Sequence, residues 1–173
     1  MHSRIFALRI VGKNIPTAYE MIKEEKVNFD LFSSFADYIG NTYSVEEDLK
    51  WLTTCFKGLF GIERKGNDIF IHLRKDNLDN YLEERYEKLQ KAFEQVDFTE
   101  FTNSYSTKIW NIKELLFGDD YGFHFGVMSD YDNFAEISYD NELEFFRLAR
   151  WLMVSKNLEE IVYRFEGSLD YHN

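Results

Sequence analysis

The hydrophobic residues of this chain change their spacing several times, and this alternation limits the folds that the chain can adopt. Residues 3–11 alternate as a strand does, with Phe6, Leu8 and Ile10 on one face. Residues 77–96 instead place apolar side chains three and four positions apart, as an amphipathic helix does. Both patterns occur in irregular order along the chain, which favours an α+β fold over a regular series of βαβ units.

Two pairs of alternating segments predict hairpins. Residues 61–74 contain a Gly66-Asn67 turn, and residues 121–139 alternate on both sides of a polar loop. Residues 158–171 alternate again at the end of the chain. With the N-terminal strand, these segments predict a mostly antiparallel sheet.

Three to five helices are expected to pack on this sheet. Ser44 followed by Glu47 fits a capping box, which would begin a helix that continues through residue 60. Asp76 is the expected N-cap of the helix over 77–96. Residues 141–155 are apolar over most of a helical circumference, which predicts a central helix.

Three further segments are less regular: 16–25 fits a short helix, 27–40 favours a helix over a strand, and 107–117 fits either. The length of 173 residues and the hydrophobic fraction of 45% suit one domain over residues 1–173. That domain divides by charge into a balanced part, 1–75, and an acidic part, 76–173.

The compartment is inferred from what the sequence can and cannot form. Cys55 is the single cysteine and has no internal disulfide partner, which indicates a reducing environment. No secretion signal or long apolar run is recognisable, so a cytoplasmic protein is expected. Cys55 lies at the border of the apolar stripe of its helix and is interpreted as a buried core thiol.

The chain carries no recognisable catalytic motif, and no catalytic residue, metal or cofactor is predicted. His124 stands out among the four histidines because acidic surroundings would favour its charged form. The segment from Asp130 to Asn133 resembles a calcium loop but lacks the required glycine and glutamate. A carboxylate-based enzyme that uses His124 and a divalent cation remains the alternative hypothesis.

The negative charge is concentrated in one part of the chain. Residues 1–75 carry a net charge of +1, whereas residues 76–173 carry −12. From Glu114 to Glu144 the sequence contains nine acidic residues and no basic one. This pattern disfavours direct binding to nucleic acids or to anionic membranes. It fits either a solvated surface that promotes solubility or a surface that binds a basic protein.

The binding hypothesis places carboxylates and tyrosines on one hairpin. Alternate carboxylates on a strand lie roughly 7 Å apart, so such a hairpin could occupy a groove built for phosphates. Tyrosine is a frequent interface anchor. The predicted partner-binding residues are Asp119, Asp120, Tyr121, Asp130, Tyr131, Asp132, Glu136, Tyr139 and Asp140.

In size, charge and lack of a catalytic motif, the sequence resembles small acidic inhibitors. These include phage anti-restriction and anti-CRISPR proteins and the immunity proteins that neutralise nuclease toxins. The resemblance implies a non-enzymatic protein that blocks a basic nuclease or another nucleic-acid-binding protein, and it carries over no functional residue. A structural subunit of a larger assembly, with self-association into a homo-oligomer, is a further alternative.

Overall fold

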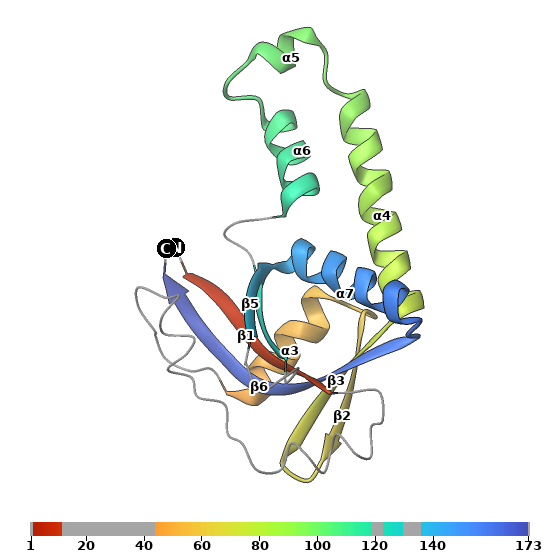
Figure 1. Ribbon diagram of the computed structural model, residues 1–173. Helices are drawn as coiled ribbons and strands as arrows, with labels where there is room; N and C mark the ends of the chain where they lie inside the picture. Colours follow the sequence, from red (N-terminus) through yellow and green to blue (C-terminus); the bar gives the residue numbers. More distant parts are fainter. Residues whose placement is uncertain (1, 12–43, 119–122, 130–135, 173) are drawn as a thin grey trace.

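The computed structural model describes residues 2–11, 44–118, 123–129 and 136–172 (Figure 1). The described strands are β1 (His2–Val11), β2 (Phe60–Lys65), β3 (Asp68–Arg74), β4 (Phe123–Ser129), β5 (Glu136–Asn141) and β6 (Glu160–His172). The described helices are α3 (Val45–Cys55), α4 (Lys75–Glu94), α5 (Phe98–Thr102), α6 (Thr107–Phe117) and α7 (Glu142–Lys156). The predicted helices at 16–25 and 27–40 fall outside the described residues.

The six strands form one sheet in the order β2-β3-β6-β1-β4-β5. Four of the neighbouring pairs are antiparallel, and β1 and β4 pair in parallel. The prediction of a mostly antiparallel sheet is therefore confirmed, with the correction that the sheet is mixed. A parallel pair is possible here because the long connection between β1 and β4, which includes the arm described below, leaves the relative direction of the two strands free of any hairpin turn.

Both predicted hairpins are present. The β2–β3 hairpin turns at Gly66, whose φ of 60° is in the left-handed region that glycine enters without steric cost. The β4–β5 hairpin pairs Phe125 with Asp140. The alternating segment at the end of the chain forms β6, which pairs with both β1 and β3.

The pairing of β1 with β6 contains a bulge. Ala7 lies opposite Gly167 and Leu8 lies opposite Phe165, which leaves Glu166 as the extra residue. The Oε1 atom of Glu166 lies 2.6 Å from Nε of Arg164 and 3.5 Å from Nε of Arg9. The extra residue thus brings one carboxylate between two arginines that lie opposite each other on neighbouring strands.

The hydrophobic core lies between one face of the sheet and the helices α3 and α7. Phe6 and Leu8 from β1 belong to it, as the alternation of residues 3–11 predicts. Phe125 from β4 stacks on Phe145 from α7, with 4.2 Å between the ring centroids. Phe146 meets further aromatic rings of the core and is completely buried.

A buried polar contact fixes α3 on the sheet. The Ser168 hydroxyl donates a hydrogen bond of 2.6 Å to Oδ1 of Asp48, and Nη1 of Arg4 lies 3.3 Å from the same oxygen. Burial raises the pKa of the Asp48 carboxyl above its usual range. The contact joins α3 to β1 and β6 and specifies how this helix docks.

Helix α3 begins at the predicted capping box but ends earlier than expected. The Ser44 side chain accepts a hydrogen bond from the Glu47 amide, and the Glu47 side chain accepts one from the Ser44 amide. The helix ends at Cys55, and Gly58 then adopts a φ of 80°. Phe56 and Leu59 still reach the core from this turn. In the sequence, Phe56 and Leu59 are spaced as if they continued the helix, which is why the helix was predicted to extend to residue 60.

The prediction of a central helix over 141–155 is wrong in one respect. Helix α7 buries one side, which includes Phe145 and Met153, against the sheet. Leu148, Trp151 and Val154 lie on its other side and are exposed. A helix that is apolar all round is expected to be covered on all sides, and among the described residues α7 is covered on only one.

Helices α4, α5 and α6 form an arm that projects from the body of the protein (Figure 1). Helix α4 runs outward over 20 residues, and α6 returns beside it. The N-cap of α4 is Arg74, so Asp76 lies in the first turn and is not the cap that the sequence predicted. Residues 107–117 are helical, whereas α5 was not predicted. The arm is hereafter residues 75–117.

Loss of the capping box should destabilise the fold in a pH-dependent way. We expect Ser44→Ala to lower the free energy of unfolding by about 1 kcal/mol near neutral pH. The Ser44 hydrogen bonds lower the pKa of Glu47 below its ordinary value of 4.5. Stabilisation through Glu47 is therefore present above pH 4.5 and is lost as the pH falls through the lowered pKa of the folded state. Urea unfolding of both proteins would show a smaller difference at acidic pH, and equal differences at both pH values would contradict this account.

Candidate functional site

The structure places three of the nine predicted binding residues. Glu136, Tyr139 and Asp140 lie on β5, which is the last strand of the described sheet and pairs with β4. They lie opposite Ser129, Gly126 and Phe125 respectively. The remaining six fall outside the described residues: Asp119, Asp120, Tyr121, Asp130, Tyr131 and Asp132.

The two ends of the base-free acidic run have polar partners in the fold. Oε1 of Glu142 lies 3.1 Å from Nη1 of Arg85, and Oε1 of Glu144 lies 3.3 Å from Nη1 of Arg147. Glu114 accepts a hydrogen bond of 2.7 Å from the indole nitrogen of Trp110. Arg85 precedes Glu142 by 57 positions, so this neutralisation could not be read from the neighbouring sequence.

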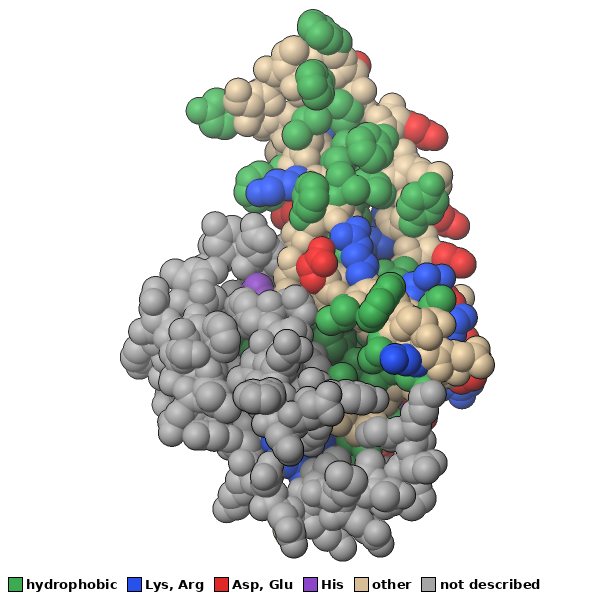
Figure 2. All heavy atoms as spheres, in the orientation of Figure 1, with side chains coloured by type: hydrophobic (Ala, Val, Ile, Leu, Met, Phe, Trp, Pro, Cys, Tyr) green, Lys and Arg blue, Asp and Glu red, His purple; other side chains and the backbone are tan. Residues whose placement is uncertain are grey.

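A second set of carboxylates lies on α4, outside the set predicted from the sequence. Glu83, Glu84, Glu87 and Glu94 are all exposed. Glu87 has a weak ion pair with Lys91 at 3.9 Å. The other three form no ion pair with any described residue. Figure 2 shows acidic side chains along one edge of the arm. The spacing of positions 83, 87 and 94, which places them on one side of a helix, was the signal that could have identified this edge.

Arg85 joins the arm to the body. Its guanidinium donates hydrogen bonds to the carbonyl oxygens of Glu114 and Leu115, at 2.7 and 3.3 Å. It also donates one to Glu142 at the start of α7. No basic residue occurs in the last turn of α6. Arg85 therefore supplies the positive charge that favours a helix C-terminus, bonds the Leu115 carbonyl, and adds a second donor to the Glu114 carbonyl, which also accepts from the Gly118 amide.

Two more contacts hold the base of α4 against α7. Tyr81 packs edge-on against Phe146, with 4.9 Å between the ring centroids. Burial raises the pKa of Tyr81 to about 12, and the charge of Glu142 adds to this shift, so the phenol is neutral at physiological pH. Oδ1 of Asp79 accepts a hydrogen bond of 2.7 Å from Nε of Arg150. An aromatic contact and an ion pair thus both fix the first turns of α4 to α7.

Asn141 links the C-terminal end of α6 to the start of α7. Its side-chain oxygen accepts a hydrogen bond from the Glu144 amide and caps α7, while its amide nitrogen donates one to the carbonyl of Phe117. Gly118 has a φ of 84°, and a Cβ at that position would lie 2.8 Å from the Asn141 oxygen. Glycine is required here for both conformation and space.

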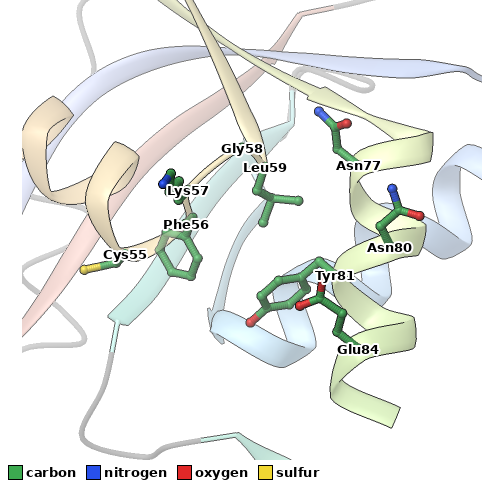
Figure 3. A pocket seen from close by; sticks show the side chains of 9 residues that line it. All are labelled: Cys55, Phe56, Lys57, Gly58, Leu59, Asn77, Asn80, Tyr81 and Glu84. Carbon is green, nitrogen blue, oxygen red and sulfur yellow. The ribbon is translucent and has the colours of Figure 1, made fainter. Parts of the chain in front are cut away.

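An open cleft of about 330 Å³ separates the turn after α3 from the first half of α4 (Figure 3). Polar groups of Lys57, Asn77, Asn80 and Glu84 line it. Tyr81 and Glu84 lie next to each other, and Phe56 lies across from them in the same view. This mixture of amide, charged and aromatic groups offers hydrogen bonds but no pair of groups arranged as nucleophile and base.

Cys55 borders the cleft and is exposed, so its prediction as a buried core thiol is wrong. The helix ends at this residue, and its side chain is therefore not packed beneath a further turn. Partial burial raises the pKa of the Cys55 thiol, and the charge of Glu142 acts in the same direction. Both effects disfavour the thiolate, which is the nucleophilic form.

The histidines do not form a catalytic group among the described residues. His124 is buried on β4, where it pairs with Ile5 and Asn141 across neighbouring strands. His72 lies between Glu63 and Glu160, at 3.2 and 3.3 Å. In the described part of the chain, no group of three or more His, Cys, Asp or Glu side chains is arranged to hold a metal ion.

The comparisons with known proteins give no family. No family model matches the chain, and no curated protein or solved structure is significantly similar to it. Of the helices that the structure describes, none has the length and hydrophobicity needed to cross a membrane. The functional argument therefore rests on the described surfaces themselves.

Removal of the Arg85 side chain tests how much this residue contributes to the attachment of the arm to the body. We expect Arg85→Met to lower the free energy of unfolding by about 2–3 kcal/mol, because it leaves the Leu115 carbonyl and Glu142 without this partner and removes one of two donors from the Glu114 carbonyl. Hydrogen exchange of the α6 amides should also become faster. Arg147→Met is the control, since its pair with Glu144 is exposed and should contribute less than about 0.5 kcal/mol. Equal losses in the two variants would show that Arg85 has no special role.

The state of Cys55 can be measured with a thiol reagent. We expect the native protein to react completely under non-denaturing conditions, because the thiol is exposed. The rate should rise with pH about a midpoint above the ordinary value of 9.0, because the pKa is raised. A thiol that reacts only after unfolding, or a midpoint below 9.0, would contradict the described environment.

Proposed function

We propose that this protein is a non-enzymatic binding protein whose acidic part, residues 76–173, binds a basic protein. The partner class is a nuclease or another protein that handles nucleic acids, and binding blocks its basic surface. The observation that carries the proposal is the exposed acidic edge of α4, formed by Glu83, Glu87 and Glu94, of which Glu83 and Glu94 have no ion pair among the described residues. We place this activity in the cytoplasm, in keeping with the single cysteine.

The spacing of these carboxylates supports a partner that normally binds phosphates. Residues four positions apart on a helix are separated by roughly 6 Å along the axis, and seven positions correspond to roughly 10 Å. Glu83, Glu87 and Glu94 therefore present a row of negative charges on a firmly anchored helix. Nucleic-acid backbones likewise present rows of negative charge. A rigid row has the further advantage that little conformational freedom is lost on binding.

The predicted residues of the β4–β5 hairpin extend this proposal to the body of the protein. Glu136 and Asp140 belong to the edge strand β5, and Glu142 follows immediately at the start of α7. Long-range attraction from both regions would accelerate association with a basic protein, and this acceleration would weaken as salt is added. Tyr139 is the proposed aromatic anchor on this strand, because tyrosine combines apolar area with a hydroxyl group.

The test begins with affinity purification from the native host and identification of the protein that co-purifies. We expect the triple variant Glu83→Gln, Glu87→Gln, Glu94→Gln to bind this partner at least about 10-fold more weakly, with a shallower salt dependence. The matched control is Glu46→Gln, Glu144→Gln, Glu159→Gln, which changes the net charge equally away from the α4 edge. Equal weakening by both triple variants would show that only net charge matters, and no weakening by either would refute the proposal.

The residues predicted from the sequence are tested in the same assay. Asp119, Asp120, Asp130 and Asp132 can be replaced together by Asn, and we expect a further loss of affinity. Inhibition of the partner's binding to DNA or RNA should decrease in parallel with affinity. Tight binding that leaves nucleic-acid binding by the partner unaffected would separate the binding activity from the proposed inhibition.

A further inference from the structure

The arm is amphipathic as a unit, because α4 and α6 both turn apolar side chains to the same side. On α4 these residues are spaced alternately four and three positions apart: Leu82, Tyr86, Leu89, Phe93 and Val96. Tyr86 and Phe93 are 60% and 53% exposed, although the helical stripe of the sequence predicts a buried position for both. The exposed carboxylates of α4 occur at other positions of the helical turn.

Helix α6 continues this apolar face. Ile112 is buried, and Ile109 and Leu116 are half-buried beside it. Trp110 and Phe117 lie seven positions apart, and more than half of each side chain is exposed. At the tip, Phe98, Phe101 and Tyr105 are between 72% and 93% exposed. Figure 2 shows hydrophobic side chains from the tip of the arm down toward the body on the face turned to the viewer.

Two helices form a single layer, which cannot enclose a core by itself. Within α4, only Leu78 and Ala92 are buried, and α6 buries only Ile112. The half-buried residues of the arm are therefore covered on one side and open on the other. Stable helical bundles complete such a layer with a second pair of helices.

The exposed apolar area is large enough for a specific interface. An aromatic side chain can bury roughly 150–250 Å². At their observed exposures, the seven exposed aromatic residues of the arm offer roughly 700–1,200 Å². A monomer usually exposes no apolar patch larger than about 300–600 Å². A specific interface of standard size buries about 800 Å² on each partner.

We propose that the occupant of this face is the same face of a second copy of the chain, so that two arms form a four-helix bundle with two-fold symmetry. A second copy presents an arm of equal length with the same four–three spacing, so side chains can interlock along the whole arm. The acidic edge of α4 lies to the side of this face and stays accessible. The inference is therefore independent of the proposed partner.

The mass of the protein in solution tests the proposal. Sedimentation equilibrium of the full chain should give twice the monomer mass of 20.8 kDa. The double variant Tyr86→Ser, Phe93→Ser should raise the dimer dissociation constant about 100-fold or more. Glu84→Ser, Lys88→Ser is the matched control, because it alters two exposed positions elsewhere on the same helix without changing net charge. The control should remain dimeric, and circular dichroism should show that both variants are folded.

Hydrogen exchange on the unaltered protein provides a second test that requires no substitution. We expect amides of residues 82–96 and 109–117 to exchange more slowly as protein concentration rises through the dissociation constant. Monomeric mass at every soluble concentration would overturn the proposal. So would a dimer that survives the Tyr86 and Phe93 substitutions, or protection that appears only outside the arm.

Discussion

The position of the whole arm depends on the hydrogen bonds of Arg85. One guanidinium meets the C-terminal carbonyls of α6 and a carboxylate at the start of α7, while its own backbone belongs to α4. The arrangement agrees with the helix dipoles, since a cation lies at the end of one helix and an anion at the beginning of another. Asp79 and Tyr81 then hold the first turns of α4 against α7. The direction in which the arm leaves the body follows from these few contacts.

Both surfaces that we propose for binding lie on α4 because this helix leaves the body after its first turns. A helix packed along its whole length shows the solvent only one side, which is normally polar. Beyond Arg85, α4 has only α6 beside it among the described residues, so it displays an acidic edge and an apolar face at the same time. Glu87 and Phe93 illustrate this division, because both are exposed and they belong to the two different surfaces. One helix can thus take part in recognition by charge and in recognition by packing.

Local patterns in the sequence were sufficient for most of the fold. The capping box at Ser44, the turn at Gly66 and the alternation of β1 each depend on residues within a few positions of one another. The errors have a different origin. Spacing shows that Tyr86 and Phe93 share the apolar side of a helix, but it does not show whether anything covers that side. Likewise, the contact between Arg85 and Glu142 spans 57 positions and is created only when the arm folds back. Of the predicted binding residues, the structure places only those on β5. The acidic edge of α4 could not be seen as a charged run, because Arg85, Lys88 and Lys91 are interspersed with its carboxylates in the sequence and separate from them only on the helix surface.

Helix α4 follows β3 without a loop, since Arg74 is both the last residue of the strand and the N-cap of the helix. The amide of Lys75 is in turn bonded to the carbonyl of Glu159, just before β6. Helix α4 is consequently continuous with β3, the second strand of the sheet, and no loop lies between them. A pull or twist applied at the far end would be transmitted as a torque to β3 and β6.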